Sequence, residues 1–172
     1  MNVAAGKSPT SGGVASRLAF FKGLQAVTTR IHATQNIDEI IFELSADLYE
    51  LFGAERLTIY TVDETRTSIL SKVKTGLHSV NSIRLPVSEN SIAGYVAYTR
   101  QMLNIPDVYD DAALKAISPH LEFRKEVDEV TGYRSRQMLA APILSSEKGE
   151  LEGVLQLINS VDGMTFSAIA EE

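Results

Sequence analysis

The spacing of the apolar residues changes from a helical to an alternating pattern near residue 53, and this change constrains the fold more than any other feature. Apolar residues recur every three or four positions over 16–33 and again over 37–52, which predicts two amphipathic helices. From Leu57 to Val62 the period becomes two, with apolar side chains on both faces, which predicts a strand covered on both sides. The chain is therefore expected to join two helices to a β-rich remainder.

Short strands separated by turns make up most of the remaining chain. Further strands are predicted at 69–74, at Ile83 and Leu85, and at 102–105, 137–144 and 151–159. Helices are predicted near 91–100 and 112–117, and a last helix would begin at Phe166. Residues 107–126 are the least regular part. This order of elements predicts an α+β domain built on an antiparallel sheet.

The sequence is expected to contain one domain after a short lead-in. Residues 1–15 are rich in Gly, Ser and Ala and predict a flexible segment, which leaves 16–172 as the domain. The last predicted helix has barely one turn before the sequence stops. We therefore expect this chain to be an excerpt of a longer, multidomain protein.

Charge and cysteine content exclude several classes of function. A net charge of −6 disfavours nucleic acid as a partner, because such affinity rests on neutralising phosphates with Lys and Arg. The sequence has no cysteine, so disulfides, thiolate nucleophiles and cysteine-bound zinc are ruled out within it, and a cytoplasmic location is expected. No apolar run is long enough to cross a bilayer. The three histidines are too far apart to suggest a metal site, and no catalytic constellation is apparent.

Three stretches of the sequence resemble the GAF domain family. They are SIAGYVAYTRQMLNIPDVY from Ser91, FRKEVDEVTGYRSRQMLAAPI from Phe123 and GELEGVLQLINS from Gly149. They are most similar to the GAF domains of cyclic-nucleotide phosphodiesterases and adenylyl cyclases. The resemblance implies a six-stranded antiparallel sheet with the N- and C-terminal helices on one face. Short helices and loops on the other face would roof a pocket for a small molecule.

The helix near residue 91 is the expected site for an anionic group. Free backbone N–H groups and the positive end of the helix dipole favour an anion there. In the resembling family a phosphate meets the positions of Ile92 and Ala93. Small Ala93 and Gly94 would allow close approach, although for Gly94 alone a helix packed closely on the sheet is the favoured explanation.

The resemblance implies six further ligand-binding side chains: Thr58, Arg124, Asp128, Thr131, Ser135 and Gln156. Asp128, Thr131 and Ser135 match positions that face the base or ribose, and Gln156 stands where some relatives read the base with Glu. Thr58 matches a hydroxyl that lines the cavity. Arg124 replaces a frequent aromatic and could stack on a base or lie in solvent. Asp128 and Thr131 could alternatively form a turn that only fixes the loop.

One motif of the cyclic-nucleotide branch is incomplete. The branch carries Asn-Lys, then Phe, then Asp-Glu, and this chain keeps Asn159, Phe166 and Glu171. Ser160 replaces the lysine and Ala170 the aspartate. Losing both partners of that ion pair together avoids leaving one charge uncompensated.

The sequence thus predicts a regulatory sensor domain that binds a small molecule, with a cyclic nucleotide as the possible ligand, and relays its state to an output domain in the same chain. The alternative is a ligand-free GAF domain that serves dimerisation and relay. Both hypotheses predict a homodimer through the terminal helices.

Overall fold

The computed structural model describes residues 50–74, 82–163 and 166, together with 18, 19, 21–23 and 25. Those described between 18 and 25, and residues 50–52, are helical. The remainder of the two predicted N-terminal helices, and the last helix beyond Phe166, lie outside the described residues.

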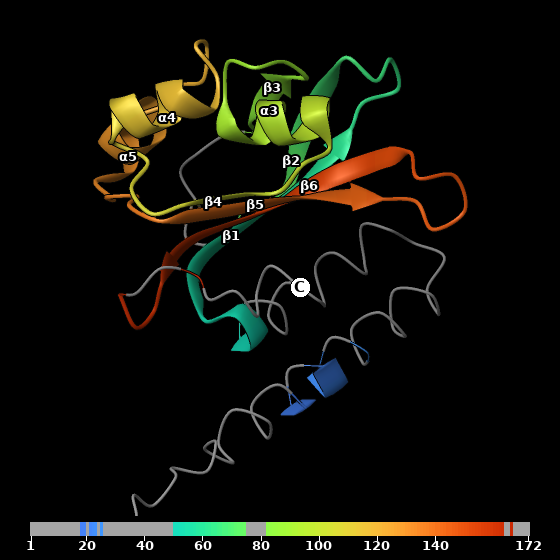
Figure 1. Cartoon of the computed structure of the whole chain (residues 1–172), viewed down its shortest axis with the longest axis horizontal. Coiled ribbons are helices and arrows are strands. Elements are labelled where there is room, and N and C mark those ends of the chain that lie inside the picture. Colours follow the sequence, from blue (N-terminus) through green and yellow to red (C-terminus); the bar gives the residue numbers. More distant parts are fainter. Residues whose placement is uncertain are drawn as a thin grey trace, which may run out of the picture.

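Six strands form one antiparallel sheet in the order β3-β2-β1-β6-β5-β4, which confirms the predicted fold class (Figure 1). The strands are β1 (Ala54–Val62), β2 (Ser68–Lys74), β3 (Arg84–Pro86), β4 (Leu103–Ile105), β5 (Met138–Leu144) and β6 (Leu151–Ser160). The first and last strands are neighbours at the centre. Residues about 100 positions apart in the sequence therefore meet in the middle of the domain.

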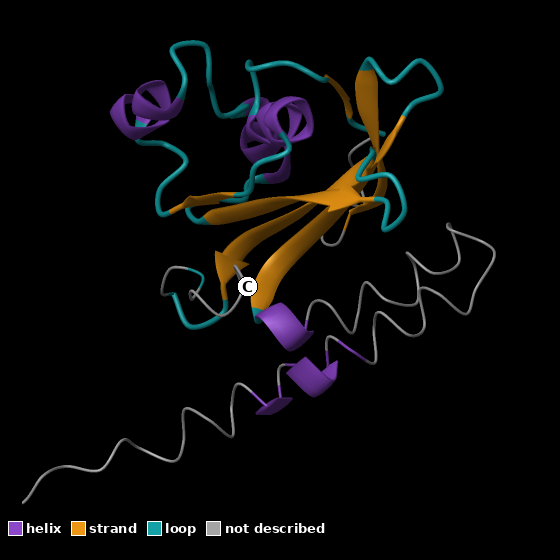
Figure 2. Cartoon of the chain, turned by 45° about the vertical axis from the view of Figure 1, so that its right-hand side comes forward, coloured by secondary structure: helices purple, strands orange, loops and turns teal. Residues whose placement is uncertain are grey.

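Three short helices, α3 (Ile92–Thr99), α4 (Asp111–Ile117) and α5 (Glu126–Thr131), lie over one face of the sheet (Figure 1). The described helical residues near the N-terminus lie on the other side (Figure 2). No helix in the described part of the chain combines the length and apolar character that a membrane span requires.

Alternation along β1 divides the buried residues between the two faces. Leu57 and Ile59 pack with Leu139, Leu157 and Phe166 on the side away from α3. On the α3 side, a second core includes Tyr60, Val96, Leu121 and Val154. The sequence pattern of apolar side chains on both faces is thus explained, because each face of the sheet is covered.

Helix α5 was not predicted from the sequence, which assigned no helix or strand to residues 127–136. It has six residues and lacks a side-chain cap at its start, and Gly132 ends it with φ of 64°. Val127, Val130 and Thr131 are β-branched and have low helix propensity. Helix α4 matches its prediction closely because Asp110 caps it, accepting a hydrogen bond from the Ala113 N–H at 3.0 Å.

Gly153 marks a close approach of β6 to β1, and replacing it should destabilise the sheet. A Cβ added at Gly153 would lie 2.1 Å from the Tyr60 carbonyl oxygen. We expect Gly153→Ala to cost about 1–3 kcal/mol of unfolding free energy, measured by urea denaturation. Glu152→Ala, at the exposed neighbouring position, is the control. Equal stability of the two variants would contradict this account of the β1–β6 pairing.

Candidate functional site

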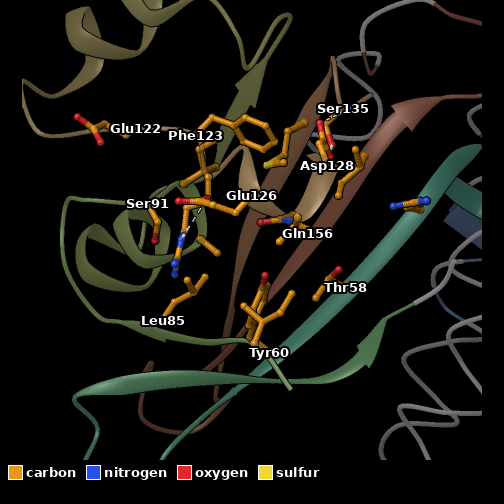
Figure 3. A pocket seen from close by; sticks show the side chains of 18 of the residues that line it. Thr58, Tyr60, Leu85, Ser91, Glu122, Phe123, Glu126, Asp128, Ser135 and Gln156 are labelled. Carbon is orange, nitrogen blue, oxygen red and sulfur yellow. Dashed lines mark hydrogen bonds and ion pairs between the residues drawn. The ribbon is translucent and has the colours of Figure 1, made fainter. Parts of the chain in front are cut away.

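A cavity of about 350 Å³ lies between the α3 side of the sheet and the segment that carries α5 (Figure 3). Pockets for small molecules commonly measure about 300–1,000 Å³. We call the residues of β1, β5 and β6 that line it the floor: Arg56, Thr58 and Tyr60 of β1, Met138 of β5, and Gln156 and Ile158 of β6. The roof is formed by residues 122–124 and 126–128. Ser91, Ile92 and Ala93 also line it at the start of α3.

The floor carries three buried polar side chains for which the described residues provide no hydrogen-bond partner. Thr58 is 1% exposed, Tyr60 3% and Gln156 8%. Thr58 and Gln156 are directly paired across β1 and β6, so both face the cavity, as does Tyr60 two residues further along (Figure 3). Within the described part of the chain none of the three side chains forms a hydrogen bond. Buried polar groups normally have a partner, so this floor is suited to a polar molecule in the cavity.

The Tyr60 hydroxyl is a hydrogen-bond donor at neutral pH. Burial raises its pKa well above the ordinary value for tyrosine, and the positive charge of Arg124 opposes part of that rise. A protonated phenol can donate to an oxygen of a bound molecule. The opposing effect of Arg124 also shows that a roof residue lies within electrostatic reach of the floor.

The start of α3 presents backbone donors to the cavity. Ser91 caps the helix, its Oγ accepting a hydrogen bond from the Gly94 N–H at 3.2 Å. Ile92 and Ala93 belong to the first turn, whose N–H groups and dipole favour an anion. Gly94 has a packing reason of its own, because an added Cβ would lie 2.6 Å from the Pro86 carbonyl oxygen.

The Asp128 carboxylate holds the roof in place through hydrogen bonds to neighbouring segments. It accepts hydrogen bonds from the Ser135 N–H at 2.7 Å, the Ser135 hydroxyl at 2.8 Å and the Tyr109 hydroxyl at 3.0 Å. Asp128 is 5% exposed and Ser135 2%. The carboxylate therefore joins α5 to the segment before β5 and to the loop before α4. We call this group of three residues the roof clasp.

The stacking around Tyr109 supports the roof clasp. Its ring lies 5.2 Å from the Phe123 ring, centroid to centroid. The guanidinium of Arg134 lies 3.4 Å from the centre of the Tyr109 ring, a cation–π contact. Burial, followed by the bond to Asp128, raises the pKa of Tyr109. Its hydroxyl consequently remains protonated and can donate to Asp128.

Seven of the eight ligand-binding residues predicted from the sequence line this cavity: Thr58, Ile92, Ala93, Arg124, Asp128, Ser135 and Gln156. Thr131 does not line it, and its hydroxyl donates to the Val127 carbonyl oxygen at 2.7 Å within α5. Asp128 does act on the loop, although it reaches Ser135 and Tyr109 and does not form a local turn. Ligand binding by these residues stays a prediction.

Sequence reasoning missed Tyr60 and Tyr109. The alternation along β1 already placed Tyr60 on the same face as Thr58, so that signal was present in the sequence. Tyr109 bonds to a carboxylate 19 residues away, and no local pattern indicates such a pair.

A second polar network joins the segment before β5 to the two central strands. The Asn159 Oδ1 accepts hydrogen bonds from the backbone N–H groups of Arg136 at 2.7 Å and Gln137 at 3.2 Å. Its Nδ2 donates to the Arg134 carbonyl oxygen at 2.9 Å. Asn159 therefore holds three residues of the segment that follows Tyr133, namely Arg134, Arg136 and Gln137. The motif positions Ala170 and Glu171 lie outside the described residues.

Glu55 completes this network from the start of β1. The Tyr133 hydroxyl donates to its carboxylate at 2.6 Å, and the Asn159 amide lies 3.2 Å from the same oxygen. The hydrogen bond from Tyr133 lowers the pKa of Glu55, partly opposed by burial and assisted by Asn159. Arg56 lies over the Tyr133 ring at 3.5 Å. The segment before β5 is thus tied to β1 and β6 where β1 begins and β6 ends.

The charged residues of the site do not cluster as metal ligands. Among the residues that the structure describes, no group of three or more His, Cys, Asp or Glu side chains could hold a metal ion. The arrangement instead offers hydrogen-bond donors and acceptors around a cavity. Such an arrangement suits the binding of a polar small molecule by hydrogen bonds.

The family model for the GAF domain matches residues 36–172. The "Probable 3',5'-cyclic phosphodiesterase pde-5" of Caenorhabditis elegans is 28% identical over 152 residues, which cover 82% of this chain and 19% of that protein. The "Dual 3',5'-cyclic-AMP and -GMP phosphodiesterase 11A" of Takifugu rubripes is 34% identical over 128 residues, which cover 68% of this chain and 13% of that protein. The chain thus spans less than a fifth of the length of either relative.

A solved structure shows the same fold. The GAF domain from a phosphoenolpyruvate-protein phosphotransferase (ptsP) of Coxiella burnetii superposes with a TM-score of 0.68 at 22% sequence identity. The match covers 90% of this chain and 85% of that chain.

Breaking the roof clasp should loosen the roof. Asp128→Asn removes the charge and leaves one amide oxygen for three donors, so we expect a loss of about 1.5–3 kcal/mol of unfolding free energy. Amide hydrogen exchange at Ser135 should accelerate. Glu129→Gln, an exposed change on the same helix, is the control. Unchanged exchange at Ser135 in Asp128→Asn would show that the clasp does not hold the roof.

Proposed function

This chain belongs to the GAF domain family, and from that membership we propose that it is the small-molecule-sensing regulatory domain of a signalling protein, with a cyclic nucleotide as its ligand. The observation that carries the proposal is the cavity whose floor holds three buried polar side chains without hydrogen-bond partners among the described residues. Leaving such groups unpaired costs free energy. A ligand that pairs them recovers that cost on binding.

The chemistry of the cavity fits a nucleotide in three respects. The Gln156 amide supplies a donor and an acceptor for the edge of a base, and the Thr58 hydroxyl can serve as either. Phe123 in the roof offers an aromatic ring for a flat heterocycle. The start of α3 offers backbone donors for a phosphate. Both relatives named above are 3',5'-cyclic phosphodiesterases by name, and one name includes cyclic AMP and cyclic GMP, which supports this ligand class.

The two polar networks suggest how a bound ligand would be sensed. A ligand under the roof would favour the closed roof clasp, because a ligand shifts an equilibrium toward the state that it contacts better. Ser135 belongs to the clasp, and the adjacent Arg136 and Gln137 bond to Asn159. Closure would then reach the ends of β1 and β6. A homodimer, an output domain in the same longer chain and a cytoplasmic location remain parts of this proposal.

Replacing Gln156 should stabilise the free protein and weaken ligand binding. Gln156→Leu removes a buried amide without a partner, which we expect to raise the melting temperature. The same change removes a group that reads the ligand and should weaken cyclic nucleotide binding by about tenfold or more, since one good hydrogen bond in a buried site is worth about 1.5 kcal/mol. Calorimetric titration with cyclic AMP and cyclic GMP, with thermal melting in parallel, measures both effects.

The exposed Gln101 provides the matched control, and Gln101→Leu should change neither quantity. A wild-type domain that binds no nucleotide would favour the ligand-free relay module. Binding that survives Gln156→Leu unchanged would remove this residue from the site.

Loss of the Tyr133 hydroxyl should separate binding from relay. In the wild type we expect a cyclic nucleotide to slow amide exchange at Ser135 and also at Val161, whose N–H donates to the Gly53 carbonyl oxygen beside the central strands. In Tyr133→Phe the bond to Glu55 is lost, so protection should remain at Ser135 and disappear at Val161. Tyr98→Phe, at an exposed tyrosine of α3, is the control. Equal protection of Val161 in both variants would argue against this route.

A further inference from the structure

We infer that Arg124 is a specificity-determining residue that binds the anionic group of the ligand, and that Glu126 is the partner that Arg124 releases when the ligand enters. The inference rests on the proposed function and deepens it. It assigns the choice between anionic and neutral ligands to a side chain of the roof.

The position of Arg124 is the first argument. Arg124 lines the cavity from the roof, and Ser91, Ile92 and Ala93 at the start of α3 line the same cavity. Its positive charge acts on the buried hydroxyl of Tyr60 in the floor. The guanidinium is therefore placed to meet a group lying between the floor and α3.

The partners of the cavity's arginines provide the second argument. The Arg84 guanidinium bonds to the Asp63 carboxylate at 2.6 Å, and that of Arg56 stacks on the Tyr133 ring at 3.5 Å. Arg124 has the weakest engagement, since its Nε lies 3.9 Å from the Glu126 carboxylate. The two side chains are 54% and 71% exposed, and such exposed pairs contribute little stability. An anion in the cavity can replace Glu126 at small cost.

The third argument is the set of donors that meet around this space. The Tyr60 hydroxyl is buried, protonated and without a hydrogen-bond partner among the described residues, and it points into the cavity (Figure 3). The first turn of α3 supplies backbone N–H groups. Together with the guanidinium, these donors suit an acceptor-only group such as a phosphodiester. A neutral nucleoside would offer no negative charge to the Arg124 guanidinium.

The release of Glu126 would also connect the anion to the roof clasp. Glu126 is the first residue of α5, and Asp128 of the clasp follows two positions later on the same helix. A carboxylate freed from Arg124 at the start of a helix is favourably placed relative to the helix dipole. Anion binding and the position of α5 would therefore depend on each other.

The test compares ligands that differ by the phosphate. Wild type, Arg124→Gln, Arg124→Lys and Glu126→Gln are titrated with cyclic AMP and cyclic GMP, and with adenosine and guanosine. We expect Arg124→Gln to weaken cyclic nucleotide binding by about tenfold or more, the scale of one charge-assisted hydrogen bond, and to leave nucleoside binding within about twofold. Arg124→Lys should recover part of the loss, and Glu126→Gln should strengthen cyclic nucleotide binding.

Arg100→Gln changes an arginine at the opposite end of α3 that does not line the cavity, and it should bind like the wild type. Thermal melting checks that each variant is folded. If the wild type binds cyclic nucleotides and Arg124→Gln binds them equally well, or loses nucleosides to the same degree, the role of Arg124 is refuted while the proposed function stands. If the wild type binds none of the four compounds, the proposed function fails and this inference falls with it.

Discussion

The antiparallel pairing of β1 with β6 is the constraint on which the rest of the structure depends. It brings Thr58 opposite Gln156 and continues through Tyr60 opposite Val154. A slip of one residue would turn every side chain of a strand to the other face. The polar floor would then enter the apolar core beside Leu57 and Leu157, and the hydrophobic side chains would enter the cavity. The close approach at Gly153 is part of the same register.

The two polar regions of the domain differ in how completely they are satisfied. Every oxygen of the Asp128 carboxylate has a donor, and Asn159 uses both ends of its amide. Fully bonded networks of this kind hold a loop in one arrangement. The floor side chains have no such partners in the described structure. Rigid support around an unsatisfied floor is the arrangement expected of a preorganised binding site.

Asp128 lines the cavity, but its carboxylate is engaged by other residues of the protein. All hydrogen bonds of that carboxylate run to Ser135 and Tyr109. These bonds fix α5 against the segment before β5 and so shape the roof. In the function that we propose, ligand recognition falls to residues that have spare hydrogen-bonding capacity, namely Thr58, Tyr60 and Gln156 in the floor and Arg124 above them.

The sequence by itself determined the elements and their faces, because these follow from local periodicity. The alternation at Leu57 to Val62 predicted both a strand and its two covered sides, and the strands and α4 lie close to their predicted limits. Helix α5 was missed because six residues rich in β-branched side chains carry no local helical signal. Tertiary structure alone decided the pairs that build the site: Asp128 with Tyr109, and Asn159 with Glu55 across 104 positions. Such pairs depend on how the strands are ordered in space, and the local sequence pattern does not predict that order.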